Sequence, residues 1–380
     1  MIILFIVSIA VILYTYAGYP IILLLLAAVG SRPVKKGEIY PYVSILLSVY
    51  NEEKNIEARI KNLLELDYPR EKLEIIVGSD GSTDETYKII RRLADENNIR
   101  YAVSFQRIGK PAMINKMAKE ARGDIFVFAD ARQKFERNVL KEFVKCFADE
   151  EVGVVSGELI IQDKEKGAGR GIGLYWNYEK ALRRMESNLG SMLGATGAIY
   201  AIRQELFRYL PNNVILDDVY IPMHAIMLKK RAIFEPAAKA YDIVASTTKK
   251  EFGRKVRTLV GNFQIFSIFS EAFNPFKSKI AFQLFSHKFL RLWMSYFLIL
   301  TFISNIFLLS KGSFFVLAFF LQIIFYSLAL SGYVFEKLGI KISGIGRILF
   351  IPYELSALNA AAVVALFKFS GGRVDARWEK

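Results

Sequence analysis

Cysteine and histidine are scarce in this chain of 380 residues, which contains one cysteine, Cys146, and two histidines, His224 and His287. A single cysteine excludes a disulfide within these residues and a cysteine-rich metal site. Two histidines exclude a histidine-rich metal centre and argue against a nucleophile that a histidine activates. Any catalysis by these residues must therefore use carboxylates, lysines, arginines and backbone groups.

Charged residues are absent from the long apolar segment between Ile2 and Val29. A helix of about 20 apolar residues crosses a bilayer core, so residues 1–30 are predicted to form an N-terminal transmembrane anchor. The alternative is a signal peptide, in which basic residues precede a short apolar core. Here no basic residue precedes Arg32, and the apolar run is longer than such a core. The uncleaved anchor is therefore the favoured interpretation.

The C-terminal third also contains long apolar stretches, near residues 289–310 and 313–335. They predict C-terminal membrane helices within residues 288–368. A further stretch, residues 345–367, contains charged residues and a proline, and it is predicted to be interfacial or re-entrant. In that case the tail, residues 369–380, stays in the cytosol with its basic residues, whereas a fourth full span would export it.

Basic residues follow the N-terminal anchor directly, at Arg32, Lys35 and Lys36. Such residues close to a span mark its cytosolic side. We therefore expect a multi-pass protein of the plasma membrane with the middle of the chain in the cytosol. The formal net charge of +14 suits anionic lipid headgroups or a diphosphate substrate, although surplus lysine and arginine can equally be solvated surface. A nucleic acid partner is not expected.

Between residues 38 and 250, short apolar runs alternate with charged, amphipathic segments. This alternation predicts βαβ units, and hence an α/β, Rossmann-like domain on a mostly parallel sheet. The expected strands are residues 43–49, 73–77, 100–105 and 125–128, and the expected helices are residues 55–66, 84–97 and 112–120. Ligands bind beyond the carboxyl ends of such strands. Acidic and polar residues follow three of them, at positions 50–53, 80–84 and 130–132.

Five short motifs follow one another along the chain: SVYNEEKNI at 48–56, GSDGSTDET at 78–86, FVFADAR at 126–132, ILDDV at 215–219 and RKVRT at 254–258. In this order they resemble the large, inverting family 2 glycosyltransferases. The likeness is greatest to the membrane-embedded synthases of cellulose, hyaluronan and poly-N-acetylglucosamine, and HKFLRLW at 287–293 is similar to them as well. The resemblance implies a GT-A-type cytosolic domain over residues 38–250. Interfacial amphipathic helices would follow over residues 251–287.

The resemblance assigns the first half of this domain to a nucleotide-sugar donor and favours a UDP-sugar. Tyr50, Asn51 and Glu52 match positions that contact the base and ribose, and Asp80 matches a residue that reads the uracil. Lys110, in GKPAMINK, matches a lysine near the diphosphate. An ammonium group is a compact donor for phosphate oxygens. The alternative is that the GKP segment forms only a turn before a helix.

Asp130 matches the first acid of the family's Asp-x-Asp metal motif, which implies a requirement for Mg²⁺ or Mn²⁺. Such a cation prefers carboxylate and phosphate oxygens and neutralises the charge on a departing nucleoside diphosphate. The third position of the motif departs from the family, because it is Arg132 and not an acid. The complete ligand set therefore stays open, and Arg132 is itself a candidate contact for phosphate.

Asp217 and Asp218 match the family's acidic pair before a helix. Inverting transfer needs a base that takes the proton of the acceptor hydroxyl during its attack on the anomeric carbon. Alignment on the second acid implies that Asp218 is this base, with Asp217 in an orienting role. Alternatively, both are only N-terminal charges that stabilise a helix over residues 218–230 through its dipole.

The acceptor side of the resemblance rests on small residues. Gly194, Thr196 and Gly197 match a turn that lines the acceptor pocket, where glycine lets the backbone approach a sugar closely. Trp176 lies in a segment that is similar to a helix near the acceptor, and its ring could stack on a sugar. Ordinary packing on an amphipathic helix is the alternative for this tryptophan.

Arg254 and Arg257 fall where processive synthases carry Gln-x-x-Arg-Trp. Arg257 matches the arginine and would hold the pyrophosphate as a bidentate donor, while Arg254 replaces the glutamine. Thr258 replaces the tryptophan, which puts processive polymer synthesis in doubt. A basic helix on anionic lipid is the alternative for the same segment.

Three functions remain at this point. The leading one is an inverting hexosyltransferase similar to a polysaccharide synthase, which moves sugar from a nucleotide sugar to a glycan or lipid-linked acceptor. The second adds a single sugar to a lipid-linked sugar or a polyprenyl phosphate. The third is a non-catalytic membrane scaffold subunit. Self-association into a homo-oligomer stays open in each case.

Overall fold

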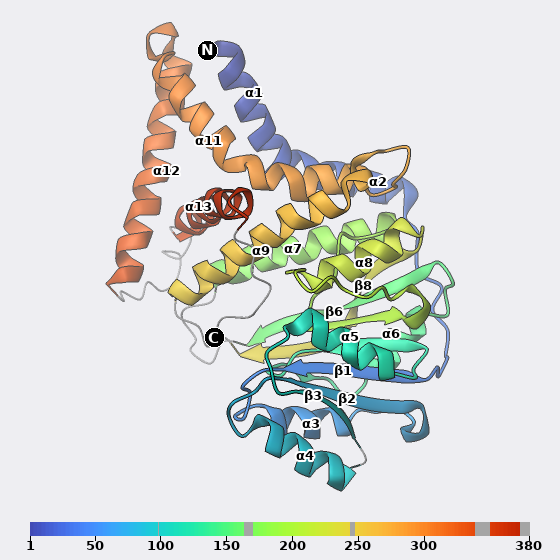
Figure 1. The fold of residues 1–380 in the computed structure, drawn as a ribbon. Coiled ribbons are helices and arrows are strands. Elements are labelled where there is room, and N and C mark those ends of the chain that lie inside the picture. Colours follow the sequence, from blue (N-terminus) through green and yellow to red (C-terminus); the bar gives the residue numbers. More distant parts are fainter. Residues whose placement is uncertain (98, 163–169, 244–247, 339–349, 373–380) are drawn as a thin grey trace.

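The computed structural model describes residues 1–97, 99–162, 170–243, 248–338 and 350–372, with side chains omitted for residues 170–176, 243 and 248–251. A layered α/β domain forms one end of the molecule and a group of apolar helices forms the other (Figure 1). The domain contains the strands β1 Val43–Val49, β2 Leu73–Asp80, β3 Arg100–Ser104, β4 Ile125–Ala129, β5 Lys134–Phe135, β6 Val152–Gln162, β7 Ile199–Arg203 and β8 Arg231–Ile243. Its helices are α3 Ile56–Leu64, α4 Thr86–Asn97, α5 Lys110–Glu120, α6 Val139–Cys146, α7 Arg170–Leu189 and α8 Asp217–Met227.

The eight strands form one sheet in the order β3-β2-β1-β4-β7-β6-β8-β5. The first four strands pair in parallel, as βαβ units require. Strand β7 runs antiparallel to both β4 and β6, β6 and β8 pair in parallel, and the short β5 is antiparallel to β8. The expectation of a parallel sheet thus holds for the first half of the domain, whereas the second half is mixed.

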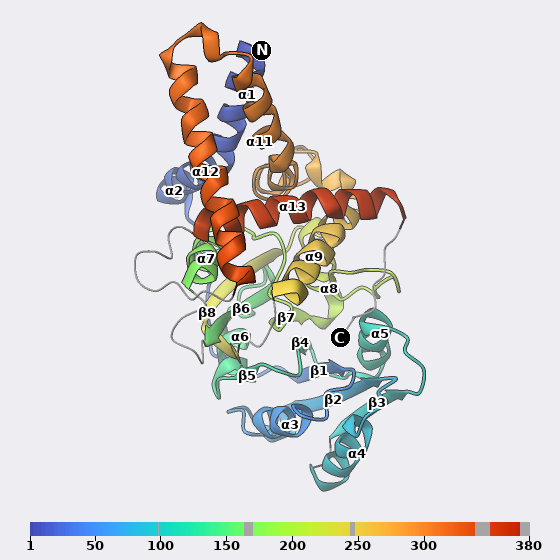
Figure 2. The ribbon, with the colours of Figure 1, turned by 90° about the vertical axis from the view of Figure 1, so that its left-hand side faces the viewer.

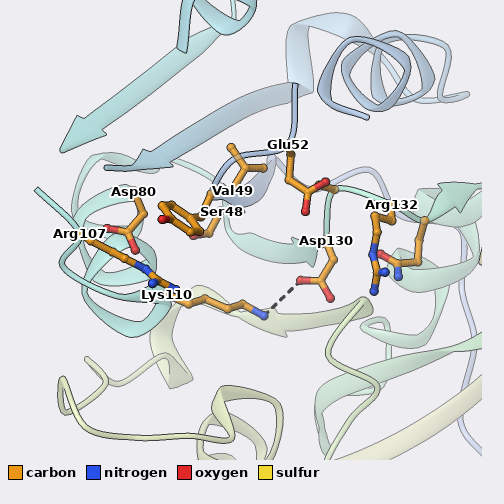
Figure 3. Close-up of a pocket in the computed structure, with 11 residues that line it drawn as sticks. Ser48, Val49, Glu52, Asp80, Arg107, Lys110, Asp130 and Arg132 are labelled. Atoms are coloured by element: carbon orange, nitrogen blue, oxygen red, sulfur yellow. Dashed lines mark hydrogen bonds and ion pairs between the residues drawn. The ribbon is translucent and has the colours of Figure 1, made fainter. Parts of the chain in front are cut away.

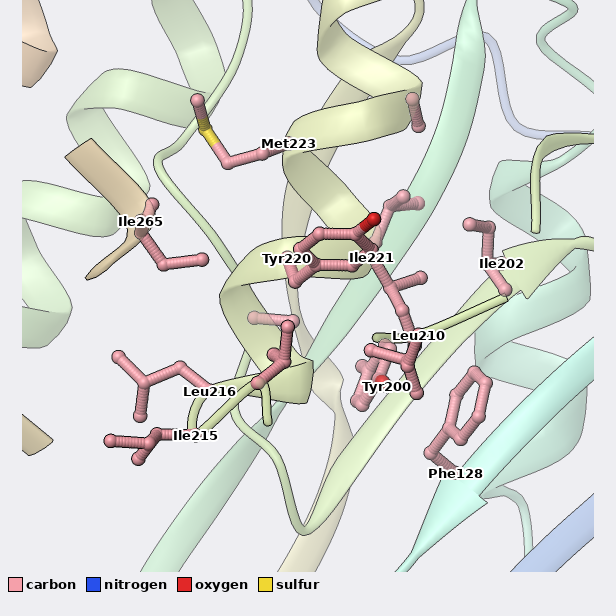
Figure 4. Close-up of a cluster of buried hydrophobic side chains, with 14 of the residues drawn as sticks. Phe128, Tyr200, Ile202, Leu210, Ile215, Leu216, Tyr220, Ile221, Met223 and Ile265 are labelled. Atoms are coloured by element: carbon pink, nitrogen blue, oxygen red, sulfur yellow. The ribbon is translucent and has the colours of Figure 1, made fainter. Parts of the chain in front are cut away.

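Both faces of the sheet are buried, which explains why its strands read as nearly continuous apolar runs. Alternate residues point to opposite faces, so on β1 Leu46 faces one core while Ile45 and Leu47 face the other. One core lies under α3, α4 and α6. The other lies under α5 and α8, and Figure 4 shows the part of it around Tyr200 and Ile221. It continues into the apolar helices through Leu292 and Ala361.

Among the described residues, three helical segments are long and apolar enough to cross a membrane: Ile2–Gly30, Ala281–Ile306 and Ser313–Lys337. The first consists of α1 Ile2–Leu13 and α2 Tyr19–Gly30, joined by a π-helical turn where the helix bends (Figure 1). The second consists of α10 Ala281–Gln283, a second π-helical turn over Leu284–Phe289, and α11 Leu290–Ile306. The third is α12, whose large apolar side chains are mostly exposed, as contact with lipid requires.

Two further helices connect these spans to the domain. Helix α9, Thr248–Ile268, lies beneath α13, Ile351–Ser370, and the Phe263 and Phe369 rings stack between them. Helix α13 runs across α12 instead of along it (Figure 2). Helix α13 covers most of the segment expected to be interfacial or re-entrant, and that placement stays a prediction. Most of the tail, from residue 373, lies outside the described residues.

Candidate functional site

The polar loops after β1 and β2 are tied together by side-chain hydrogen bonds. Asn51 adopts a positive φ of 51°, which brings its side chain towards the neighbouring loop. Its Oδ1 accepts from the Thr83 backbone N–H at 2.8 Å. Its own backbone N–H donates to the Ser82 hydroxyl at 3.1 Å, and the Glu52 N–H donates to the Thr86 hydroxyl at 2.7 Å. Asn51 therefore fixes the shape of the loops beside the pocket.

Asp80, at the end of β2, holds the loop that leads into α5. Its two carboxylate oxygens accept from the backbone N–H groups of Ile108 and Gly109, at 2.7 and 2.9 Å. Gly109 has a φ of +93°, a conformation that glycine adopts without strain. These contacts fix the first residue of α5, which is Lys110. The predicted role of Asp80 in reading a base is untested, and its contacts here are to this loop.

Lys110 is the centre of a buried charge cluster. Its ammonium lies 3.2 Å from Asp130 Oδ1, just after β4 (Figure 3). It also lies 3.3 Å from Asp217 Oδ2, at the start of α8. The three side chains are only 14, 22 and 10 % exposed. Burial alone would lower the pKa of Lys110, but the carboxylates of Asp130, Asp217 and Asp218 outweigh it and raise that pKa. The cluster joins three elements that are far apart in sequence.

Asp218 lies beside this cluster and is held by a backbone turn. Its Oδ2 accepts from the Gly197 N–H at 3.2 Å, and its backbone carbonyl accepts from the Ala195 N–H at 2.7 Å. Burial and the neighbouring Asp217 raise the pKa of Asp218 to about 6, against the opposing effects of Lys110 and Arg183. A carboxylate with such a pKa can take up a proton close to neutral pH.

The turn at residues 194–197 brings small residues against the acidic pair. Gly194 has a φ of +128°. A Cβ on Gly197 would lie 2.9 Å from Asp218 Oδ2. Thr196 is buried, donates its backbone N–H to the Ser156 hydroxyl, and accepts from the Arg183 guanidinium at 2.8 Å. The predicted acceptor residues other than Trp176 are thus adjacent to Asp218.

Gly197→Ala is expected to lower the rate of a reaction that uses Asp218 about 10- to 100-fold while the protein stays folded, because the added methyl displaces the Asp218 carboxylate. The measurement is kcat together with the melting temperature. Gly30→Ala is the matched control, since a Cβ there meets no atom within 4 Å. An unchanged kcat in Gly197→Ala would show that the position of this carboxylate does not limit the reaction.

A pocket opens at the carboxyl ends of β1 and β4. Its lining residues come from the loops just described and from the segment after β4: Ser48, Val49, Tyr50, Glu52, Asp80, Arg107, Lys110, Asp130, Ala131, Arg132 and Gln133. The Arg107 guanidinium lies over the Tyr50 ring, 4.1 Å from its centroid. Arg132 is exposed at the rim. An aromatic face, cations and carboxylates therefore surround one cavity.

Some predicted site residues lie apart from this pocket. Arg254 is exposed on α9 and Arg257 is half-buried on the same helix. Trp176 belongs to α7, but its side chain lies outside the described part of the structure.

Sequence reasoning did not predict three residues that lie in or near the site: Arg107, Arg183 and Tyr200. Arg107 could have been found from its position three residues before Lys110. Tyr200 lies within β7 and is fully buried, and its hydroxyl has no hydrogen-bond partner among the described residues. Burial and the nearby carboxylates of Asp217, Asp218 and Asp130 hold the pKa of this hydroxyl well above its usual value.

Residues 44–210 match the family model of glycosyl transferase family 2. The poly-β-1,6-N-acetyl-D-glucosamine synthase of Staphylococcus aureus (strain COL) is 24 % identical over 242 residues, covering 62 % of this chain and 58 % of the relative. The enzyme of the same name from Staphylococcus epidermidis is 22 % identical over 228 residues, covering 59 and 55 %. The chain thus matches less than two thirds of the length of these curated relatives.

Among solved structures, the mannosyltransferase PcManGT from Pyrobaculum calidifontis, in complex with GDP-Man and Mn²⁺, superimposes with a TM-score of 0.72. The match covers 97 % of this chain and 99 % of that chain, with 23 % sequence identity. At this identity the likeness shows a common fold. The family match and the common fold agree, and the chain therefore contains a family 2 glycosyltransferase domain with the GT-A fold.

Proposed function

We propose that this protein is an inverting glycosyltransferase that moves a hexosyl group from a nucleotide-diphospho sugar to an acceptor at the membrane. The observation that carries the proposal is the cluster of Lys110 with Asp130 and Asp217, which adjoins Asp218. Lys110 and Asp130 of this cluster line the pocket at the strand ends. This arrangement combines a phosphate-binding cation, an oxygen ligand for a metal and a carboxylate base in one site.

The donor is expected to enter between the Tyr50–Arg107 pair and Lys110. An aromatic ring and a guanidinium provide flat surfaces for a nucleobase, while an ammonium suits the diphosphate. Sequence resemblance favours uridine, and the PcManGT structure holds GDP-Man. Glu52 completes the pocket wall beside the predicted ribose position.

The residues at β4 fit a hard divalent cation. The described residues contain no group of three or more acidic, histidine or cysteine side chains that could hold a metal alone. Mg²⁺ and Mn²⁺ sites in phosphoryl chemistry commonly need one or two carboxylates, with substrate phosphates as the remaining ligands. Asp130, partly exposed in the pocket, provides such a carboxylate, and Arg132 does not. When bound, the cation would neutralise the charge on the departing nucleoside diphosphate.

The transfer step follows from the positions of the two aspartates. An acceptor hydroxyl attacks the anomeric carbon while Asp218 takes its proton, and a new carbon–oxygen bond forms. The bond between that carbon and the phosphate oxygen breaks at the opposite face, and the nucleoside diphosphate leaves with the bonding electrons. Lys110 donates to the diphosphate, and Asp217 holds the Lys110 ammonium in position.

Two acceptor classes have support. The curated relatives are named as polysaccharide synthases, which favours a growing glycan. Thr258, which replaces a tryptophan of processive synthases, favours a single addition to a lipid-linked sugar or a polyprenyl phosphate instead. The three candidate spans suit either acceptor, because both are presented at the bilayer.

The test uses membranes that carry the wild type or Asp218→Asn, a panel of labelled nucleotide sugars, and separation of the products by size. A long product from the wild type alone supports a polymer synthase, and a short, lipid-extractable product supports a single addition. If no nucleotide sugar of the panel gives up its labelled sugar, the transferase proposal is contradicted and the scaffold alternative is supported.

Chelation of divalent cations is expected to abolish transfer, and Mg²⁺ or Mn²⁺ should restore it. The effect follows because Lys110, which is already paired with Asp130 and Asp217, cannot alone neutralise the negative charge of the diphosphate. The measurement is the rate in chelator before and after metal is added back. Full activity in chelator would contradict the role of Asp130 as a metal ligand.

A further inference from the structure

The chain that leads into α8 runs irregularly over residues 207–216 and ends directly at the acidic pair. Residues 214–216 are buried, and the last of them is the N-cap of α8. The backbone groups of a buried, irregular segment need hydrogen-bond partners from elsewhere in the fold. The positions of Asp217 and Asp218 therefore depend on what holds residues 207–216, which we call the base loop.

The first element that holds the base loop is α5. Asn115 Nδ2 donates to the Leu210 carbonyl at 2.8 Å, and Asn115 Oδ1 accepts from the Leu210 backbone N–H at 2.8 Å. Helix α5 begins at Lys110. The same helix therefore carries the ammonium that pairs with Asp217 and the amide that fixes the base loop at Leu210.

A second side-chain amide holds the base loop close to α8, and it comes from α9. Gln264 Oε1 accepts from the Ile215 backbone N–H at 3.0 Å, and Gln264 Nε2 donates to the Asn213 carbonyl at 2.8 Å. These partners fix which end of the amide carries the oxygen, because a backbone N–H only donates and a carbonyl only accepts. Gln264 is buried, and its bond to Ile215 lies two residues before Asp217.

Helix α9 also packs tightly against the end of the base loop. A Cβ on Gly261, three residues before Gln264, would lie 2.5 Å from Leu216 Cγ and 3.2 Å from Ile215 Cγ2. The absence of a side chain at Gly261 thus permits the close approach of the helix. Figure 4 shows Ile215, Leu216 and Ile265 of α9 within one cluster of buried side chains. Packing and hydrogen bonding from α9 therefore both hold the end of the base loop.

The other side of α9 contacts α13. The Phe263 ring, next to Gln264 in the chain, stacks on the Phe369 ring of α13 with 5.8 Å between the two centroids. Helix α13 in turn packs against α11 and α12 of the candidate spans. Figure 2 shows α9 between α13 and the sheet. Helix α9 therefore connects the base loop to the helices of the membrane region.

We propose that Gln264 is a positioning residue, which holds the base loop so that Asp218 faces the acceptor hydroxyl during transfer. This inference rests on the proposed function and adds a residue of α9 to the groups that serve it. The residues that line the donor pocket come from other segments of the chain. Loss of Gln264 should therefore displace the base and leave the donor pocket intact. A displacement of about 1 Å in a reacting group can lower a rate about 100-fold.

The experiment compares the full-length wild type with Gln264→Met, which nearly keeps the length of the side chain but removes both hydrogen bonds. With the nucleotide sugar that the wild type uses, kcat should fall about 10- to 100-fold while the Kd for that nucleotide sugar stays nearly unchanged. Gly261→Ala keeps both hydrogen bonds but pushes on Leu216, so it should give the same separation of kcat from Kd. Gln204→Met, at an exposed position, is the matched control and should behave as the wild type does.

Amide hydrogen exchange of the base loop gives a measurement that does not depend on transfer. The Ile215 N–H loses its acceptor in Gln264→Met, so a peptide that covers residues 211–218 should exchange faster than in the wild type and in Gln204→Met. Faster exchange over the whole domain would instead show general destabilisation, and it would overturn the positioning role. If Gln264→Met does not fold, the kcat and Kd of Gly261→Ala decide the question.

Faster exchange of the base loop together with an unchanged kcat would overturn the proposal, while the transferase itself stands. A fall in kcat with an equal loss of nucleotide-sugar binding would overturn it as well, because partial unfolding removes both. If the wild type transfers sugar from no nucleotide sugar of the panel, the proposed function fails, and the role of Gln264 in transfer fails with it.

Discussion

Asp218→Asn is expected to reduce kcat for sugar transfer by about 10²–10⁴-fold, the usual contribution of a general base, while the Kd for the nucleotide sugar stays nearly unchanged. Asparagine keeps the size of the side chain and can still accept from the Gly197 N–H, so the turn at residues 194–197 is preserved. It cannot take up a proton. Asp95→Asn, on an exposed face of α4, is the matched control.

The pH dependence gives a second test of Asp218. Its pKa of about 6 means that the carboxylate is mostly ionised above pH 6 and protonated below it. Because a base acts in its ionised form, kcat/KM of the wild type should fall as the pH drops through about 6. That limb should be missing from the residual activity of Asp218→Asn. If the acidic limb of the kcat/KM profile persists in this variant, Asp217 is the general base instead.

As the pH rises through about 6, the stability of the fold should fall while the activity rises. A carboxyl whose folded pKa is raised stabilises the fold below its unfolded pKa, and this contribution is lost as the pH rises through its folded pKa of about 6. At pH 7 to 8 the ionised Asp218 therefore lowers the free energy of unfolding. Asp218→Asn removes this cost, so its melting temperature should be higher than that of the wild type at pH 8 and similar at pH 4.

The first half of the catalytic domain was predictable from the sequence because its signals are local. Short apolar runs and amphipathic helices gave four strands and three helices whose ends lie within three residues of the observed ones. The mixed pairing of β6, β7 and β8 was not predictable in this way. Whether a strand runs parallel or antiparallel depends on the path of the chain between strands, and a strand buried on both faces reads alike in either direction.

The charge cluster around Lys110 was harder to predict from the sequence than the motifs were. The motifs identified Lys110, Asp130 and Asp217 separately, each at the end of its own element, and only the fold shows that one ammonium contacts both carboxylates. Arg183 had no signal, because a single arginine on a charged helix resembles a solvated residue. Its contact with the Thr196 hydroxyl, next to the turn that holds Asp218, appears only once the chain is folded.

Lys110→Met is expected to lower kcat/KM by about 10²–10³-fold and to reduce the melting temperature. Methionine fills a similar volume but leaves Asp130 and Asp217 buried without their shared cation, and loss of one partner from a buried ion pair costs about 3–5 kcal/mol. The donor also loses a ligand for its diphosphate, so its Kd should rise. Lys119→Met, at an exposed position of the same helix, is the matched control.

The pH profile of Lys110→Met separates a role in the charge cluster from simple damage to the fold. Lys110 is the strongest of the groups that favour the ionised form of Asp218, so its removal should raise the pKa of Asp218 above 6. The acidic limb of kcat/KM should then move to higher pH in Lys110→Met and stay in position in Lys119→Met. A variant that is only partly unfolded would lose rate equally at every pH, because the fraction of intact sites scales kcat without changing the pKa of the base. An unmoved limb would mean that Lys110 acts on the donor alone, and that the base is electrostatically independent of the phosphate-binding side of the site.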